Sequence, residues 1–534
     1  MLAPSSRRPR RPAPRIRTLR PMSGSGPSQA DAVDELRRQV ATALTSAQDP
    51  NVAAAAVEVG ELRRLSGGAS RETWAFSADG RALILQRTRP GSSMGGPSMA
   101  DEDRLLAAAV VAGVPVPEVV VDAAGCEPYL GPARITAHVL GEALGPRIVR
   151  DDRFAPARSV LVGQCGRALA AIHSIDPVAV TGLESVDVLE RLRTGLDLVE
   201  EARPAFELAL RWLADHRPPA RPPAVVHGDF RVGNLLVDPA SGLTAVLDWE
   251  LAHLGDPLED LGWLCTRAWR FGGAGEVGGI GPVSDLLDTY AEATGAPVDP
   301  DHVRWWIVAG TLTWGLICAV QARRHLDGHV QSVELATIGR RVVETEYDLL
   351  GLLGLDAPPD GSGPAPSPTD PNRGRPAAGS NAAPPLDRGP DRAAAADPTV
   401  EEAGPDRTRS PDRQGRPTAA ELLDAVRSHL ADQVAPTLDG SAAFQLKVAG
   451  NALAIVEREL RLGPAMALRA TELLAGLGLA GVTDEASLAA AIRGGEVDGP
   501  PGSPLAATVR ALAVDRLRIA NPKWLLPPDR PDPQ

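Results

Sequence analysis

The chain has 534 residues and a formal net charge of −13 at pH 7. That length allows several domains of ordinary size, each large enough to bury a core. A hydrophobic fraction of 43% and a charged fraction of 23% exclude collagen-like, coiled-coil and wholly disordered chains. The acidic balance argues against a nucleic-acid partner, because binding a phosphate backbone needs a basic face.

Two further features bear on the cellular compartment. The four cysteines lie far apart in the sequence without a CxxC pair, so we expect small buried thiols in a reducing cytoplasm rather than disulfides or a zinc site. Residues 305–322 carry no charge and reach the length of a marginal membrane span. They contain glycines, threonines and a glutamine, and no second segment resembles them. We therefore expect a buried helix and no membrane partner.

Composition divides the chain into parts. Residues 1–29 form a basic tail, for which a disordered extension, a transit peptide and a misassigned start at Met22 are the alternatives. Residues 356–415 contain 13 prolines and no aromatic residue, and such a segment cannot bury enough apolar surface to offset its ordering entropy. We predict a Pro-rich disordered linker there, between a large domain at residues 30–355 and a small all-helical domain at residues 416–528.

The large domain begins with a helical pattern at residues 32–44. Strand patterns follow, and Asp79–Gly80 between two of them is a hairpin turn signal. With a helix near residues 100–112, these elements form a β-rich lobe at about residues 30–140. The strands are expected at residues 57–65, 74–77, 82–87, 114–121 and 133–139.

From residue 155 onward the apolar residues recur at helical spacing, which predicts an α-rich lobe at about residues 141–355. The small domain is also helical throughout, and Thr418 with Glu421 three residues later is a capping-box pattern. The helices of the large lobe are expected at residues 157–173, 187–201, 204–216, 285–294, 302–324 and 330–353.

The segment at residues 225–263 carries polar residues at the ends of apolar strands. Asp229 and Asn234 precede a short strand, residues 238–242 (DPASG) form a turn, and a second strand runs back to Asp248. An antiparallel hairpin returns its end to its beginning, so Asn234 and Asp248 are expected to be neighbours. Oxygen ligands of this kind suit Mg²⁺, which binds one or two protein carboxylates together with phosphate oxygens.

This HGDxxxxN motif, followed by a hydrophobic hairpin and an aspartate, resembles the aminoglycoside phosphotransferase and choline kinase branch of the protein-kinase-like fold, over roughly residues 50–350. The resemblance implies an α+β, two-lobed fold and transfer of the γ-phosphoryl group of ATP, with Mg²⁺, to a small-molecule hydroxyl. It makes Asp229 the catalytic aspartate that orients the hydroxyl, and Asn234 and Asp248 the metal ligands. Arg231 would contact a phosphate or an acidic group of the substrate.

Neighbouring residues are expected to support this site. By resemblance, His227 holds the catalytic loop, and Asp260 braces it from the following helix, which Asp256 caps. A phosphohydrolase metal cluster that joins His253 and Asp256 to the motif is an alternative. No paired-histidine helical spacing supports that alternative.

The segment LSGGASRETW at residues 65–74 resembles the loop that covers the nucleotide phosphates in these kinases. Its glycines let the backbone approach the phosphates, while hydroxyls and N–H groups donate hydrogen bonds. The expected phosphate-binding residues of this loop are Ser66, Gly67, Gly68 and Ser70.

The third strand departs from the family pattern, because it lacks the lysine that normally pairs with the nucleotide phosphates. Gln86 stands in the lysine register with Arg87 beside it, and neighbouring strand residues point to opposite faces. We expect Arg87 to bind phosphate, since a guanidinium is always charged and forms a fork of donors. Glu102 resembles the acid that pairs with the missing lysine, and a solvated helix face is its alternative role.

The segments HGDFRVGNLL and DWELAHLGDP resemble the sequences of phosphotransferase domains related to acyl-CoA-dehydrogenase-associated kinases. This implies a hydroxyacyl-CoA-type acceptor, with an aminoglycoside as the second acceptor class. The missing lysine leaves open a nucleotide-binding pseudokinase that acts as a scaffold. The small helical domain resembles an uncharacterised domain that accompanies such phosphotransferases, and we expect it to dock within the chain or between copies in a homo-oligomer.

Overall fold

The computed structural model describes residues 29–47, 57–65, 71–88, 96–199, 201–355, 417–527 and 529–530. The predicted tail at residues 1–29 lies outside this set except for its last residue, and the predicted linker at residues 356–415 lies outside it entirely. The described residues fall into two compact units. One takes its residues from Met1–Ser92 and Val120–Ala137, and the other from Ser93–Val119 and His138–Gln534.

The first unit is built on one five-stranded sheet with the strand order β1-β2-β3-β5-β4. The turn between β2 and β3 is formed by Asp79 and Gly80, whose φ angles of 47° and 81° suit a tight hairpin and confirm the turn signal. The elements are α1 (Gln29–Ser46), β1 (Arg63–Leu65), β2 (Arg71–Ala78), β3 (Arg81–Thr88), β4 (Val119–Val121), α3 (Ala123–Leu130) and β5 (Ala133–Ala137).

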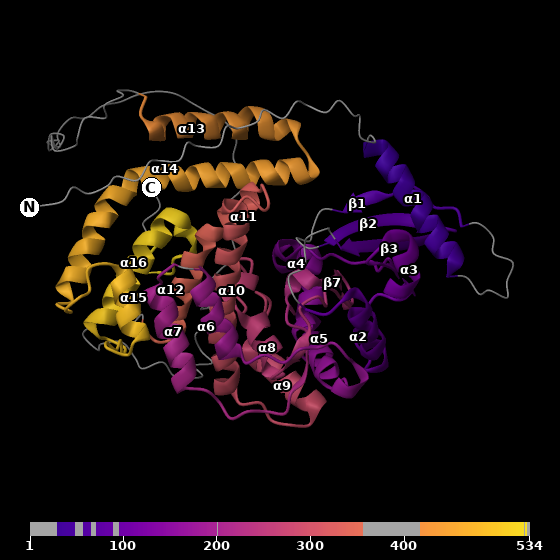
Figure 1. The fold of residues 1–534 in the computed structure, drawn as a ribbon, viewed down its shortest axis with the longest axis horizontal. Coiled ribbons are helices and arrows are strands. Elements are labelled where there is room, and N and C mark those ends of the chain that lie inside the picture. The colour runs from indigo at the N-terminus through magenta and orange to yellow at the C-terminus, as the bar shows by residue number, and fades with distance from the viewer. Residues whose placement is uncertain are drawn as a thin grey trace, which may run out of the picture. The chain divides into compact units, whose positions relative to one another are not determined.

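One face of this sheet packs against α1 and α3. Leu83 and Leu85 of β3 share a buried cluster with Leu36 and Val40 of α1 and with Ile135 of β5. Figure 1 shows α1 running across the strands. Because side chains alternate along a strand, the even-numbered residues of β3 face the opposite side of the sheet.

Three expected strands of this lobe are shorter than predicted, and one helix was missed. Of residues 57–65 only β1 is a strand, of residues 114–121 only β4, and of residues 133–139 only β5. The missed helix α3 spans little more than two turns and contains Pro128, so its sequence carries no long apolar period.

The second unit is mostly helical, and together with the sheet of the first unit it confirms the expected α+β, kinase-like fold class. Its short strands form two separate pairs, β6 with β9 and β7 with β8. The elements up to residue 355 are α2 (Met99–Val111), α4 (Gly145–Arg150), α5 (Ala155–His173), α6 (Val188–Val199), α7 (Pro204–Asp215), β6 (Ala224–Val226), β7 (Leu235–Asp238), β8 (Gly242–Val246), β9 (His253–Gly255), α8 (Leu258–Cys265), α9 (Val283–Thr294), α10 (Pro300–Leu326), α11 (Val333–Ile338) and α12 (Val342–Leu352).

The uncharged segment noted in the sequence lies in α10. Among the described residues this is the one helix long and apolar enough to cross a membrane, and 67% of its most apolar window is buried inside the protein. Trp305, Val308 and Leu312 on this helix are at most 3% exposed. The burial confirms the expectation of a core helix.

The single helix expected at residues 330–353 is divided into α11 and α12 by a 3-10 turn at Gly339–Arg341. A Cβ atom at Gly339 would lie 2.6 Å from the Cβ of Ala322 on α10. The break therefore occurs where the chain passes close to the core helix, a tertiary constraint that the helical period does not reveal.

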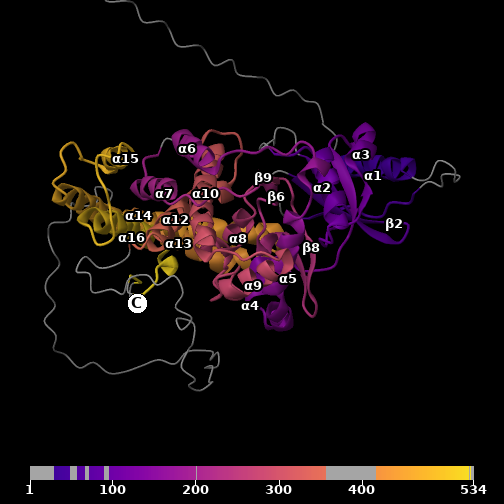
Figure 2. The same cartoon turned by 90° about the horizontal axis from the view of Figure 1, so that it is seen from below.

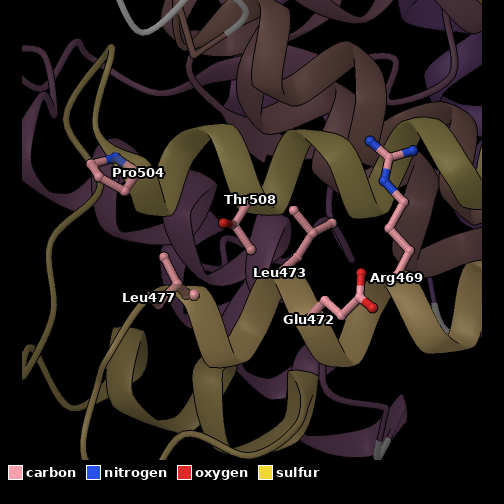
Figure 3. A pocket seen from close by; sticks show the side chains of 7 residues that line it. Arg469, Glu472, Leu473, Leu477, Pro504 and Thr508 are labelled. Carbon is pink, nitrogen blue, oxygen red and sulfur yellow. The ribbon is translucent and has the colours of Figure 1, made fainter.

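The C-terminal part is helical, as expected, and its helices are α13 (Ala419–His429), α14 (Gly440–Gly476), α15 (Glu485–Arg493) and α16 (Pro504–Ala520). Thr418 and Glu421 form the predicted capping box at the start of α13. Helix α14 runs for 37 residues and contains Pro464. Figure 3 shows a pocket between α14 and α16, lined by Arg469, Glu472, Leu473, Leu477, Pro504 and Thr508.

These C-terminal helices pack on the preceding helices of the same unit. Helix α15 lies on α7, α16 lies on α12, and α14 lies on α11. Figures 1 and 2 both show α16 beside α12. Leu488 and Leu505 belong to the same buried cluster as the core of the preceding helices, so the docking is apolar at its centre.

Candidate active site

The candidate catalytic loop follows β6, which pairs antiparallel with β9. Gly228 has a φ angle of +79°, and a Cβ atom there would lie 2.3 Å from the carbonyl oxygen of Leu251. Only glycine fits this conformation and this approach. The tight turn at Gly228 is what brings the next residue, Asp229, out of the strand and into the site.

A buried carboxylate on α8 holds this turn. Asp260, which is fully buried, accepts hydrogen bonds from the backbone N–H groups of His227 at 2.7 Å and Gly228 at 3.0 Å. Its carboxylate also lies 3.2 Å from Nε2 of His173, whose other ring nitrogen contacts the Tyr290 hydroxyl at 2.8 Å. The brace proposed for Asp260 from the sequence is therefore present.

His227 connects the loop to the metal-ligand candidate Asp248. Its Nδ1 accepts a hydrogen bond from the Asp229 backbone N–H at 3.2 Å, and its Nε2 donates to the carbonyl of Leu247 at 3.1 Å. The ring is fully buried, and burial lowers the pKa of His227 below its ordinary value. A neutral ring with one donor and one acceptor satisfies both contacts.

Three donors fix the carboxylate of Asp229, which is 14% exposed. Arg231 Nε lies 3.0 Å from Oδ1, Trp263 Nε1 lies 2.9 Å from Oδ1, and Asn234 Nδ2 lies 2.6 Å from Oδ2. Charge-assisted hydrogen bonds of this kind are stronger than neutral ones. The carboxylate is thus held in one orientation and remains partly open to solvent.

The hairpin predicted from the sequence is confirmed. Leu235 of β7 pairs with Val246 of β8, and the N–H of Leu247 donates to the carbonyl of Asn234 at 2.8 Å. This pairing brings Asn234 beside the residue before Asp248, as the register required. Asn234 is 6% exposed.

Asp248 adopts a left-handed backbone conformation with φ of +66°. For a residue other than glycine this conformation costs on the order of 1–3 kcal/mol and is concentrated at functional sites. The backbone of Asp248 is therefore held in a conformation of higher energy, at the strand end where the sequence predicted a metal ligand.

Tryptophans pack beside the catalytic loop, and the sequence analysis did not single out Trp263 or Trp269. The guanidinium of Arg231 stacks over the ring of Trp269 at 4.9 Å, and Trp269 packs against Trp263 at 5.2 Å and Trp314 at 4.7 Å. A usable signal was the spacing of Asp260 and Trp263, which places both on one side of α8. That side faces the catalytic loop.

The residues of the phosphohydrolase alternative are engaged elsewhere. His253 pairs with Glu259 at 3.2 Å, and Asp256 pairs with His302 at 3.0 Å while accepting from the N–H of Leu258 as a helix cap. Burial opposes the charge on Glu259, but Arg191 and His253 outweigh burial and lower its pKa to about 2. Within the described ranges, no group of three or more His, Cys, Asp or Glu residues is arranged to hold a metal.

At the nucleotide end, the loop residues Ser66, Gly67, Gly68 and Ser70 lie outside the described residues. Glu102 lies on the buried side of α2 and is 1% exposed, so the solvated-face alternative for it is wrong.

Strand β3 separates the two candidates for the missing lysine. Arg87 is an odd-numbered residue of β3, like Leu83 and Leu85, so its side chain lies on the face of the sheet that packs against the helices. It forms an ion pair with Glu72 at 3.0 Å. Gln86 lies on the other face, where its direct cross-strand neighbour is Arg134 of β5. Arg134 is 2% exposed and is the largest fully buried side chain among the described residues. The sequence pattern did not single it out.

The Asp260 brace makes a stability prediction. Asp260→Ala leaves two buried N–H groups and His173 without their acceptor, so we expect it to lower the free energy of unfolding by about 3–5 kcal/mol. Asp260→Asn keeps one oxygen acceptor and should cost less. Urea denaturation measures the difference, with Asp288→Asn on the exposed side of α9 as the control. An Asp260→Ala variant as stable as the control would show that the turn needs no brace.

Comparison with known proteins identifies two family matches in the chain. Residues 61–306 match the model of the family described as Phosphotransferase enzyme family, and residues 436–524 match a domain of unknown function, DUF6285. A curated relative from mouse, acyl-CoA dehydrogenase family member 10, is 32% identical over 221 residues, which is 38% of this chain and 20% of that protein. Acyl-CoA dehydrogenase family member 11 from chicken is 30% identical over 222 residues, 38% of this chain and 27% of that protein.

The match therefore spans only about a fifth to a quarter of the length of these relatives. Among solved structures, a choline/ethanolamine kinase family protein from Mesorhizobium loti is 20% identical, with a TM-score of 0.40 and coverage of 58% of this chain and 93% of that chain. The family resemblance inferred from the HGD motif is confirmed by the family model. Residues 61–306 form a domain of the phosphotransferase enzyme family.

Proposed function

We propose that the chain is an ATP- and Mg²⁺-dependent phosphotransferase that moves the γ-phosphoryl group of ATP to a hydroxyl of a small molecule. One observation carries the proposal. The β7–β8 hairpin places Asn234 next to the residue before Asp248, and Asn234 donates directly to the carboxylate of Asp229. An oriented base and two oxygen ligands on adjacent backbone are the parts that phosphoryl transfer needs.

Asp229 would receive the acceptor hydroxyl. Its carboxylate accepts the hydroxyl hydrogen bond and takes the proton as the oxygen attacks the γ-phosphorus. A new P–O bond forms to the acceptor, the bond to the β-phosphate oxygen breaks, and ADP leaves. The three donors on Asp229 keep its remaining lone pairs pointed at one place, which lowers the entropy cost of reaching the transition state.

The metal-ligand candidates suit a hard cation. The amide nitrogen of Asn234 donates to Asp229, which leaves its carbonyl oxygen as the group available for a ligand. With the Asp248 carboxylate, this provides the oxygen ligands that Mg²⁺ takes beside phosphate oxygens and water. Bound there, Mg²⁺ would neutralise charge on the β- and γ-phosphates.

The surroundings of Asp229 favour an acceptor with an acidic group. Arg231 adds a positive charge beside the carboxylate, and the rings of Trp263 and Trp269 add apolar surface. A hydroxyacyl-CoA-type compound offers both acid groups and an apolar chain, and relatives are named as acyl-CoA dehydrogenase family members. A polycationic aminoglycoside would meet Arg231, which disfavours that alternative.

The nucleotide phosphates need a positively charged side chain as a partner, and we propose that Arg134 is this partner. Its register opposite Gln86 puts its side chain on the face where the family lysine would stand. Arg87, the residue that the sequence favoured, is on the other face and holds Glu72. Without any such cation, Gln86 would favour the pseudokinase alternative. We propose a cytoplasmic setting, since the four cysteines are free and buried.

The catalytic proposal predicts that Asp229→Asn and Asp248→Asn each lower phosphoryl transfer at least about 100-fold, because the first removes the base and the second a metal ligand. Transfer from γ-labelled ATP to a panel of hydroxyacyl-CoA compounds, simple alcohols and aminoglycosides measures it, with Asp288→Asn as the control. A wild-type protein that binds Mg-ATP and transfers to no acceptor would favour the scaffold instead.

The nucleotide proposal predicts that Arg134→Gln weakens Mg-ATP binding about 10-fold or more, since a hydrogen bond to a charged group contributes about 1.5–3 kcal/mol. Arg134→Lys keeps the charge and should bind better than Arg134→Gln. Arg87→Gln should change the Kd by less than about threefold, because its partner is Glu72. Titration calorimetry decides, and a larger effect of Arg87→Gln would restore Arg87 as the phosphate ligand.

The acceptor proposal predicts a change in selectivity. Arg231→Ala should lower kcat/KM for a hydroxyacyl-CoA about tenfold more than for a neutral alcohol of the same chain length, because only the former loses an ion pair. The ratio of the two values cancels any common effect on Asp229. An unchanged ratio would show that Arg231 serves the loop and not the acceptor.

A further inference from the structure

The domain of unknown function supplies cations to acids buried in the preceding helices of the second unit. Arg493 of α15 lies 2.7 Å from Glu207 of α7, and Glu207 is 6% exposed. Arg516 of α16 lies 3.1 Å from Glu346 of α12, which is fully buried. A buried carboxylate is costly unless it is paired. In the docked arrangement each of these acids pairs with an arginine of the C-terminal domain, and Glu346 also lies 3.4 Å from Arg203.

The end of the same domain reaches a further buried acid, Asp348 of α12. Trp524 lies in a 3-10 turn, Pro522–Trp524, and its Nε1 donates to Asp348 at 3.0 Å. Arg267 bridges the two residues, since one of its nitrogens lies 2.6 Å from the Asp348 carboxylate and another donates to the Trp524 carbonyl at 2.6 Å. Its guanidinium also stacks over the Trp524 ring at 4.5 Å.

This contact is buried rather than exposed to solvent. The side chain of Asp348 is 7% exposed, and burial raises its pKa to about 6 although Arg267 and Trp524 both favour the charged form. An arginine held by a carboxylate, a carbonyl and an aromatic ring has little freedom left. Truncating the Trp524 side chain would remove the ring over Arg267 and the Nε1 donor to Asp348, whereas the main-chain carbonyl would remain.

Arg267 is the first residue of a 3-10 turn, Arg267–Trp269, that ends in the tryptophan under the catalytic loop. The guanidinium of Arg231 stacks over the ring of Trp269, which also packs against Trp263. Arg231 and Trp263 are two of the three donors to Asp229. One three-residue turn thus joins the C-terminal domain to the groups that orient the proposed base.

We propose that the domain of unknown function positions the catalytic loop in cis, with Trp524 as the positioning residue that fixes the turn Arg267–Trp269. Trp524 itself touches neither Asp229 nor the groups that hydrogen-bond to it. It acts through Arg267, then Trp269, then Arg231 and Trp263. The effect on turnover rests on the proposed phosphotransferase function, whereas the ordering of the turn does not.

The test uses Trp524→Ala in the full chain. We expect kcat for phosphoryl transfer to fall about tenfold or more, since a small misplacement of a catalytic group is costly, while the Kd for Mg-ATP stays within about twofold. Trp524→Phe keeps an aromatic ring over Arg267 and loses only the Nε1 donor to Asp348, so it should recover most of the rate. Glu472→Ala, at the exposed pocket on α14, is the control from the same domain and should match the wild type.

Hydrogen exchange gives a second readout that needs no turnover. In Trp524→Ala, peptides covering residues 227–234 and 263–270 should exchange faster than in the wild type, and the exchange in α5 and α10 should not change. Wild-type exchange in those two peptides would overturn the proposal, as would faster exchange throughout the chain, which reports general unfolding. Equal loss of kcat and of nucleotide affinity would also overturn it. If the wild type transfers no phosphoryl group, the exchange result still decides.

Discussion

The site depends on the buried carboxylate of Asp260, which accepts the hydrogen bonds that two backbone N–H groups would otherwise donate to water. Asp260 accepts from His227 and Gly228 at the point where the chain leaves β6 in a conformation that only glycine adopts comfortably. Without that acceptor the turn would bury unsatisfied donors, at a cost of about 1–3 kcal/mol each. Because Asp229 follows this turn directly, the direction of the proposed base is set by a residue on α8 that never contacts a substrate.

A second layer of polar contacts extends this arrangement in both directions. His227 joins the loop to the strand end before Asp248, and Trp263, one helical turn after Asp260, donates to Asp229. The aromatic cluster beneath it then reaches Arg267, where the C-terminal domain begins to contribute. The catalytic loop is therefore held by elements from α8, β8 and the C-terminal domain, which are far apart in the sequence.

The sequence predicted the parts of this site that depend on residues close together in the chain. Turn residues and strand lengths determined the β7–β8 hairpin, so the proximity of Asn234 and Asp248 could be inferred. The tryptophan cluster was missed, because a buried tryptophan in the core and one under a catalytic loop have similar patterns, and only the spacing of Asp260 and Trp263 indicated it. Arg134 was missed for a similar reason, since its meaning comes from its cross-strand register with Gln86. Likewise, the helical period at residues 330–353 carries no sign that Gly339 must approach α10.

The central claim is that Asn234 and Asp248 hold a divalent ion beside Asp229. A crystal structure of the full chain with Mn²⁺ and a non-hydrolysable ATP analogue tests it most directly, since Mn²⁺ gives an anomalous signal and prefers the same oxygen ligands. The account predicts an anomalous peak bonded to the Asn234 carbonyl oxygen, the Asp248 carboxylate and phosphate oxygens. A bound nucleotide whose metal lies away from both residues, with Asp248 turned toward solvent, would contradict it.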